Sequence, residues 1–101
     1  MSKQKKVEVT YITISQLQIS GYNVRQERDA DHIEELAKSI HEQGILQPIL
    51  VRPEENKYGI VIGSRRYTAA KKANMKEMPA LVQDMDKSQA IEASLVENIQ
   101  R

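Results

Sequence analysis

The sequence contains no cysteine, tryptophan or phenylalanine. Without cysteine, the chain can form neither disulfides nor thiolate metal sites, and it has no thiol nucleophile, which fits a reducing compartment. Nucleobase stacking on phenylalanine or tryptophan is also excluded, and the core is predicted to consist of Ile, Leu, Val, Ala and Met. No apolar run approaches the roughly 18 residues of a membrane span, and no apolar signal core follows the basic start. We therefore expect a cytoplasmic protein without membrane contact.

The proportions of hydrophobic and charged residues are those of a folded domain. Its 101 residues are 40% hydrophobic and 29% charged, which is typical of a globular protein and provides for one core. The net charge of +1 is too small for the whole surface to attract anions. Any anion site must therefore come from a local cluster of basic residues.

Hydrophobic periodicity predicts alternating strands and helices. The expected strands are 5–14 at a sheet edge, 45–52, 58–62 and 80–83, with a hairpin turn at 53–57 and loops at 20–28 and 75–79. The expected helices are 31–44, which Gly44 closes, 65–73, which Ser64 caps, and a last one that Asp86 and Gln89 cap and that carries Ile91, Leu95, Val96 and Ile99. We predict an α/β (α+β) fold in which a small mixed sheet is flanked by three to four helices.

The segment Gly63-Ser64-Arg65-Arg66 carries the clearest chemical signal, because it stands at a predicted strand-to-helix turn. Free N–H groups at a helix start favour an anion, and two guanidinium groups strengthen that preference. Glycine allows a ligand to approach the backbone closely. A di- or triphosphate is the expected ligand, although the same residues could be solvated arginines in ordinary surface ion pairs.

Two further groups of polar residues are candidates for the same ligand. Glu97 and Asn98 offer a carboxylate beside an amide oxygen, which suits Mg²⁺ held jointly with phosphates, but exposed polarity explains them equally simply. Ser39, Gly44 and Gln47 stand near a helix-to-strand bend where backbone groups could meet a nucleobase edge, or where Gly44 merely ends a helix. His32 and His41 have no neighbouring ligands in the sequence, and we interpret them as surface residues.

Four linked motifs resemble the amino-terminal domain of ParB-type DNA-partition proteins over about residues 12–101. They are Glu35-Leu36-Ala37-Lys38-Ser39-Ile40, Gly44-Ile45-Leu46-Gln47-Pro48-Ile49-Leu50-Val51-Arg52, Gly63-Ser64-Arg65-Arg66-Tyr67-Thr68-Ala69-Ala70 and Glu97-Asn98-Ile99-Gln100-Arg101. Residues 1–11 are interpreted as a basic tail and first strand. The resemblance implies a domain that binds CTP with Mg²⁺ and closes two protomers into a clamp around DNA, in a cytoplasmic, nucleoid-associated protein that works with a ParA-type motor ATPase.

The resemblance also implies roles for individual residues. Gly63, Ser64, Arg65 and Arg66 would hold the triphosphate, and Glu97 and Asn98 would serve the metal and phosphates. Ser39, Gly44 and Gln47 would line the base pocket, and Asn23 and Arg25 match the loop that closes over the nucleotide. The last helix ends without a stop signal, so we expect further domains, among them a helix-turn-helix region that reads the centromere.

The sequence departs from the family pattern at two positions. Ser64 replaces the usual glutamate and Val24 the usual proline. Removing a carboxylate beside phosphates does not oppose binding, but it removes a group that could assist hydrolysis. We therefore predict CTP binding with slow or absent turnover.

Three other functions could involve the same residues. Sulfiredoxins share the fold, but they use a catalytic cysteine where this chain has Ser64, so the absence of cysteine argues against sulfinate reduction. A free-serine kinase stays open, with Asp29, Asp31 or Glu34 as candidate bases. So does an interaction module that spreads on DNA without nucleotide.

Overall fold

The computed structural model describes residues 8–19, 30–44 and 47–99, and of residues 30–32 and 97–99 it describes the backbone only. The predicted fold class is confirmed. The strands are β1 (Val9–Thr13), β2 (Leu17–Ile19), β3 (Ile49–Glu54), β4 (Lys57–Ile62) and β5 (Glu77–Val82). The helices are η1 (Ile14–Gln16, a single 3₁₀ turn), α1 (Ala30–Gln43), α2 (Ser64–Lys72) and α3 (Lys87–Ile99). Within these ranges no helix is both long and apolar enough to cross a bilayer.

The five strands form one mixed sheet in the order β1-β5-β3-β4-β2. β1 pairs antiparallel with β5 at one edge, as expected for an edge strand, and β2 pairs parallel with β4 at the other. β3 joins the two halves, because it is antiparallel to β4 and parallel to β5. β4, the strand that leads into Gly63, therefore lies next to the central strand β3.

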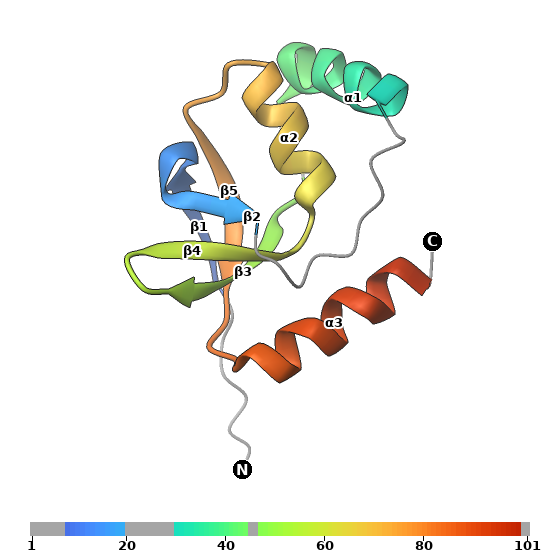
Figure 1. Ribbon diagram of the computed structural model, residues 1–101. Coiled ribbons are helices and arrows are strands. Elements are labelled where there is room, and N and C mark those ends of the chain that lie inside the picture. Colours follow the sequence, from blue (N-terminus) through green and yellow to red (C-terminus); the bar gives the residue numbers. More distant parts are fainter. Residues whose placement is uncertain (1–7, 20–29, 45–46, 100–101) are drawn as a thin grey trace.

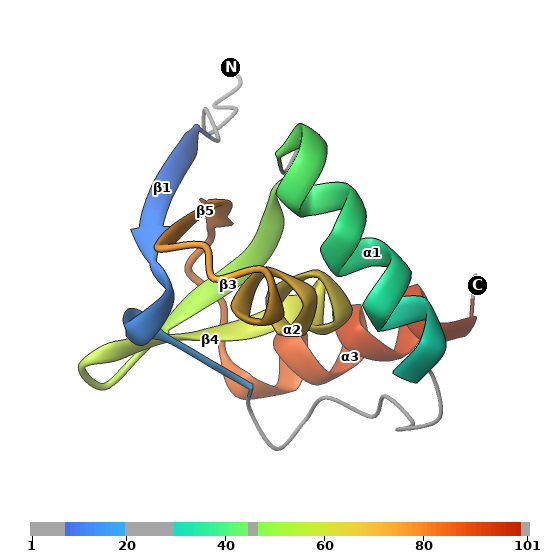
Figure 2. The same cartoon turned by 90° about the horizontal axis from the view of Figure 1, so that it is seen from above.

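Helices cover both faces of the sheet (Figure 1). Ile60 and Val61 are adjacent on β4 and both are buried, so they point to opposite faces. Ile60 packs in the cluster that includes Tyr67 and Ala70 of α2. Val61 packs with Ala90 of α3. α1 lies against α2 on the side away from the sheet, as the second view also shows (Figure 2).

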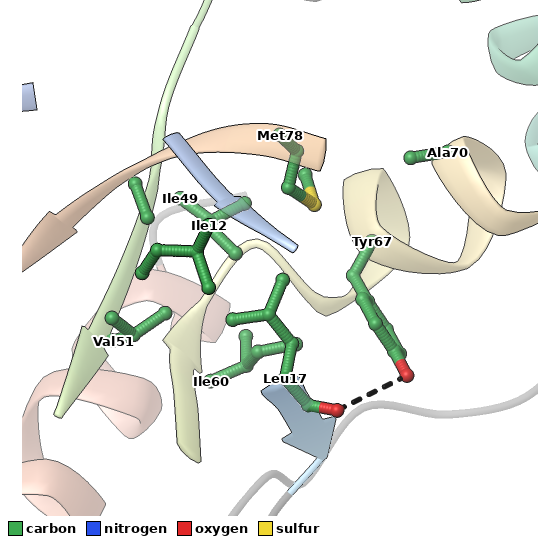
Figure 3. Close-up of a cluster of buried hydrophobic side chains, with 9 residues drawn as sticks. Ile12, Leu17, Ile49, Val51, Ile60, Tyr67, Ala70 and Met78 are labelled. Carbon is green, nitrogen blue, oxygen red and sulfur yellow. Dashed lines mark hydrogen bonds between the residues drawn. The ribbon is translucent and has the colours of Figure 1, made fainter. Parts of the chain in front are cut away.

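The main core lies between α2 and the sheet (Figure 3). Its largest fully buried side chains include Ile49, Ile60 and Met78. Burying side chains of this size stabilises the fold by roughly 1.5–3 kcal/mol each. Tyr67 joins this otherwise aliphatic core, contrary to the prediction from composition, because its hydroxyl donates a hydrogen bond of 3.4 Å to the Leu17 carbonyl oxygen. Its polar end thereby has a partner.

Several predicted boundaries were wrong, and two of them involve proline. β3 begins only at Ile49, after Pro48, and it continues through Pro53 to Glu54, so the hairpin turn is shorter than predicted. Pro53 is tolerated because β3 pairs with β5 only as far as Val51. Similarly, β5 begins at Glu77 within the predicted loop, and its pairing with β3 starts at Ala80, after Pro79.

The helix limits agree more closely with the predictions. Gly44 ends α1 with φ +85°, and its N–H donates to the Ile40 carbonyl oxygen at 2.7 Å. Asp86 and Gln89 form the predicted reciprocal capping box before α3, with hydrogen bonds of 2.8 and 3.0 Å. Ile91, Leu95 and Val96 are nevertheless exposed, and among the described side chains of α3 the buried ones are Ala90 and Ser94.

Candidate functional site

The candidate site is built around the turn from β4 into α2. Gly63 stands at this turn with φ +108° and ψ 23°, a conformation that side chains disfavour. A Cβ atom on Gly63 would lie 2.5 Å from Cγ2 of Ile49, which is fully buried. The turn therefore requires glycine for its backbone conformation and for its packing on β3.

Gly63, and not Ser64, is the N-cap of α2, so the predicted capping role of Ser64 was wrong. Ser64 is the first residue of the helix and only 6% exposed, and its carbonyl oxygen accepts a hydrogen bond from Thr68 Oγ1 at 3.0 Å. Glycine at the cap has no side chain that could accept a hydrogen bond from the N–H groups at the helix start.

The first hydrogen bond within α2 runs from the Tyr67 N–H to the Gly63 carbonyl oxygen at 3.0 Å. Ser64, Arg65 and Arg66 come before it, in the first turn, where the N–H groups point out of the start of the helix. They stand at the positive end of the helix dipole, and neither the cap nor the first turn supplies an acidic residue. This arrangement favours an anionic ligand.

Both arginines of the motif are half-buried. The Nη2 atom of Arg66 donates a hydrogen bond of 2.9 Å to Oε1 of Gln47. This contact joins two residues predicted separately, one for phosphate and one for the base pocket, and it links the connection between α1 and β3 to the start of α2. The Nε atom of Arg65 is buried, so its guanidinium group is held close to the protein.

The other predicted site residues are placed less fully. Ser39 is exposed on α1 and Gly44 ends that helix, so both stand near the connection that carries Gln47. Asn23 and Arg25 lie outside the described residues. Glu97 and Asn98 lie in the last turns of α3, where only the backbone is described. Figure 1 shows that α3 runs from the end of β5 toward the side of the molecule on which α2 begins.

The structure also shows a polar cluster that the sequence analysis missed. Arg52 donates through Nε to the Met85 carbonyl oxygen at 2.9 Å and through Nη1 to the Glu54 carboxylate at 3.1 Å. Gln18 donates to the other oxygen of that carboxylate at 2.9 Å. A Cβ on Gly59 would meet the same carboxylate at 2.3 Å. The cluster anchors the segment before α3 to the sheet, and no local sequence pattern signals it because Gln18 and Met85 are far in the chain from Arg52 and Glu54.

Comparison with known proteins places the chain in a family. Residues 1–99 match the sequence model of the ParB N-terminal domain. The probable chromosome-partitioning protein ParB of Coxiella burnetii is 47% identical over 96 residues, which are 95% of this chain and 33% of that protein. The chain thus spans about a third of the length of such curated relatives.

Solved structures agree in sequence and in fold. C-terminally truncated chromosome-partitioning protein ParB from Caulobacter crescentus, complexed with CTP-γ-S, superposes with a TM-score of 0.86 at 37% identity, covering 93% of this chain and 54% of that one. The same protein complexed to the centromeric parS site gives 0.79 at 35% identity, covering 91% and 48%. Sulfiredoxin from Arabidopsis thaliana, at 20% identity and a TM-score of 0.70 over 85% of this chain and 96% of that one, shares the fold alone. Since the family match spans nearly every residue and holds in three dimensions, the chain belongs to the ParB N-terminal domain family.

Proposed function

We propose that this chain is the CTP-binding switch and self-association domain of a ParB-type protein that acts in DNA segregation. The observation that carries the proposal is the start of α2, where the positive end of the helix dipole and two half-buried arginines follow Gly63. A relative 37% identical was crystallised with the CTP analogue CTP-γ-S, which supports a cytidine nucleotide as the ligand.

The donor set fits a triphosphate. A guanidinium group offers a planar fork of donors that matches phosphate oxygens, and the hydrogen bond from Arg66 to Gln47 holds this fork before ligand arrives. Its partner Gln47 is exposed, so its amide is accessible to a nucleobase. The phosphates would lie at Gly63 to Arg66, and Ser39, Gly44 and Gln47 would face the base.

Mg²⁺ would be held jointly by the phosphates and by Glu97 and Asn98. The described residues contain no group of three or more acidic, histidine or cysteine side chains that could hold a metal ion. Protein sites commonly hold Mg²⁺ through one or two side chains together with substrate phosphates, and the proposed site would follow this pattern. When bound, the ion would neutralise phosphate charge.

Slow or absent turnover remains our proposal for this site. The Ser64 side chain is a neutral hydroxyl on a residue that is only 6% exposed, so this position supplies no carboxylate to the phosphates. A phosphate-release assay should give a rate at or near the background without protein. Rapid release of phosphate from CTP would contradict this part of the proposal.

Exposed apolar residues on α3 support the proposed self-association. Ile91, Leu95 and Val96 are 37%, 43% and 47% exposed, although they are large and apolar. Exposed apolar surface of this kind is typical of an interface. We propose that this surface is covered when two copies associate with nucleotide bound. DNA would be contacted mainly by regions outside this chain, and the partner motor would be an ATPase of the ParA type.

Isothermal titration with each of the four nucleoside triphosphates and Mg²⁺ tests the nucleotide proposal. We expect heat with CTP in preference to ATP, and none with Arg65→Ala. Arg66→Lys keeps the charge but loses the fork, and it should weaken binding about tenfold. Lys87→Ala, which removes an exposed charge at the start of α3, is the matched control and should bind normally. Unchanged affinity in Arg65→Ala would overturn the proposal. A preference for ATP would also overturn it, and would favour the alternative of a free-serine kinase.

A further inference from the structure

A concave surface lies beside the C-terminal half of α2, lined by other residues than the candidate nucleotide site. It is a groove of about 670 Å³ between η1, the loop before β5, the start of β4 and the last turns of α2. From α2 the groove is lined by Tyr67 and Lys71, whereas the residues assigned to the nucleotide are Gly63 to Arg66 at the start of the helix. None of the residues assigned to CTP lines the groove.

Three lysines from three different elements surround this groove. Lys57 begins β4, Lys71 lies in the last turn of α2, and Lys76 precedes β5. All three are exposed, and no carboxylate is among the described residues that line the groove. The ammonium group of Lys71 lies 5.3 Å from the centre of the Tyr67 ring, a cation–π contact that holds it at the wall. The rim is therefore cationic, and no acidic side chain among the described lining residues neutralises it.

The last carbonyl oxygens of α2 are largely engaged in hydrogen bonds within the chain. The carbonyl oxygens of Ala69, Ala70 and Lys71 already accept hydrogen bonds of 2.9 to 3.0 Å from the N–H groups of residues 73–75. Three of the last four carbonyl oxygens of the helix are therefore already satisfied. The electrostatic character of the groove is set by the three ammonium groups.

The interior of the groove is apolar, in contrast to its rim. Ile14, Leu17 and Met75 line it, together with the ring of Tyr67. These side chains belong to the main core or pack against it, so the interior is fixed by the fold. The Ile14 N–H also donates to the Lys76 carbonyl oxygen at 2.9 Å, which ties η1 to the loop that carries the third lysine. A ligand for this surface must combine an apolar part with negative charge.

We propose that this groove docks an acidic protein segment that places an apolar side chain between flanking carboxylates. Charge complementarity to Lys57, Lys71 and Lys76 selects the acidic residues, and the apolar interior selects the anchor. Nucleic acid fits less well, because a phosphate backbone would contact the rim and leave the apolar interior uncovered. This proposal is independent of the CTP proposal, since it concerns other residues.

Amide chemical shifts of the ¹⁵N-labelled chain, titrated with a capped synthetic peptide of glutamates flanking a leucine–phenylalanine pair, test the proposal. We expect saturable shifts at Ser15, Lys71 and Lys76. The double variant Lys71→Gln/Lys76→Gln should weaken binding about tenfold, whereas Lys38→Gln/Lys87→Gln, which removes the same charge elsewhere, should change it less than about twofold. A peptide with glutamine in place of glutamate, and one with serine in place of the apolar pair, should both bind more weakly.

Three results would overturn the proposal. The first is an absence of shifts at the groove, and the second is equal weakening by the two double variants, which would indicate unspecific charge attraction. The third is a stronger perturbation of the same amides by a short random-sequence DNA duplex or by phosphatidylglycerol vesicles than by the peptide. Spectra of each variant without peptide verify folding, so that lost binding is not mistaken for lost structure.

Discussion

Gly63 shows how one residue can serve both stability and ligand binding. Its φ of +108° gives α2 a cap without a side chain, and its missing Cβ leaves room for Ile49. Gly44 has a similar φ of +85°, but a Cβ there would meet nothing within 4 Å. A side chain at Gly44 would strain only the backbone, whereas a side chain at Gly63 would strain the backbone and also clash with Ile49.

Gly63→Ala should destabilise the domain more than Gly44→Ala. Both variants force alanine into a left-handed conformation, which costs about 1–2 kcal/mol. Only Gly63→Ala adds overpacking against a fully buried isoleucine, worth roughly another 1–3 kcal/mol. Urea unfolding followed by circular dichroism measures the two free energies of unfolding. Equal losses in the two variants would show that packing against Ile49 does not constrain this position.

Among the site residues, sequence reasoning was most successful where the chemistry is local. The turn at Gly63 and the start of α2 follow from consecutive residues, so the pattern predicts them directly. The hydrogen bond between Gln47 and Arg66 spans 19 positions, and local patterns predicted its two members only as separate candidates. Lys57, Lys71 and Lys76 come together only through the sheet and α2, and for that reason their groove was not predicted.

At the scale of elements, the missed strand is the shortest one. β2 has three residues, too few for an alternating pattern to be recognised, and it is defined by its parallel pairing with β4. The long helices were predicted well because their capping residues and periodicity agree. The last helix shows the limit of periodicity, since its apolar residues predict a helix but not that Ala90 and Ser94 would be its buried side.

Docking of α1 on α2 includes an exposed ion pair between Lys72 Nζ and Glu34 Oε2 at 2.8 Å. The hydrogen bond and the charge of Lys72 lower the pKa of Glu34 below its ordinary value of 4.5. A carboxyl group whose pKa is lower in the folded state stabilises the fold above its unfolded pKa, and the contribution is lost as the pH falls through the folded value. The ion pair therefore supports the helix pair at neutral pH and not in acid.

Lys72→Gln should raise the pKa of Glu34 toward the ordinary value, because the variant removes both the ammonium charge and the charged donor. An NMR titration of the Glu34 side-chain carboxyl carbon measures the midpoint. Lys71→Gln removes the neighbouring charge, which lies over Tyr67, and should leave most of the shift in place. Equal changes in both variants would show that general charge, rather than the hydrogen bond, sets the titration of Glu34.

For the whole molecule, the proposed functions occupy separate surfaces. The nucleotide site lies at the start of α2 and the lysine-rimmed groove at its end, while α3 exposes its apolar residues on the other side of the sheet (Figure 1). Arg52 lies on the central strand β3 and donates a hydrogen bond to the Met85 carbonyl oxygen just before α3. This bond ties the start of α3 to the sheet, whose strand β4 leads into Gly63.

Association of the whole domain should depend on nucleotide and on the exposed surface of α3. Light scattering of the wild-type chain should give a monomer alone and a dimer or larger assembly with CTP and Mg²⁺, because a switch domain changes partners only when ligand favours the associated state. Leu95→Glu places a charge on that surface and should keep the chain monomeric while CTP still binds by titration. Ile19→Glu alters another exposed apolar residue, on β2, and should still associate. If association occurs without nucleotide, the spreading module that needs no nucleotide becomes the better explanation; if Leu95→Glu associates normally, another surface forms the interface.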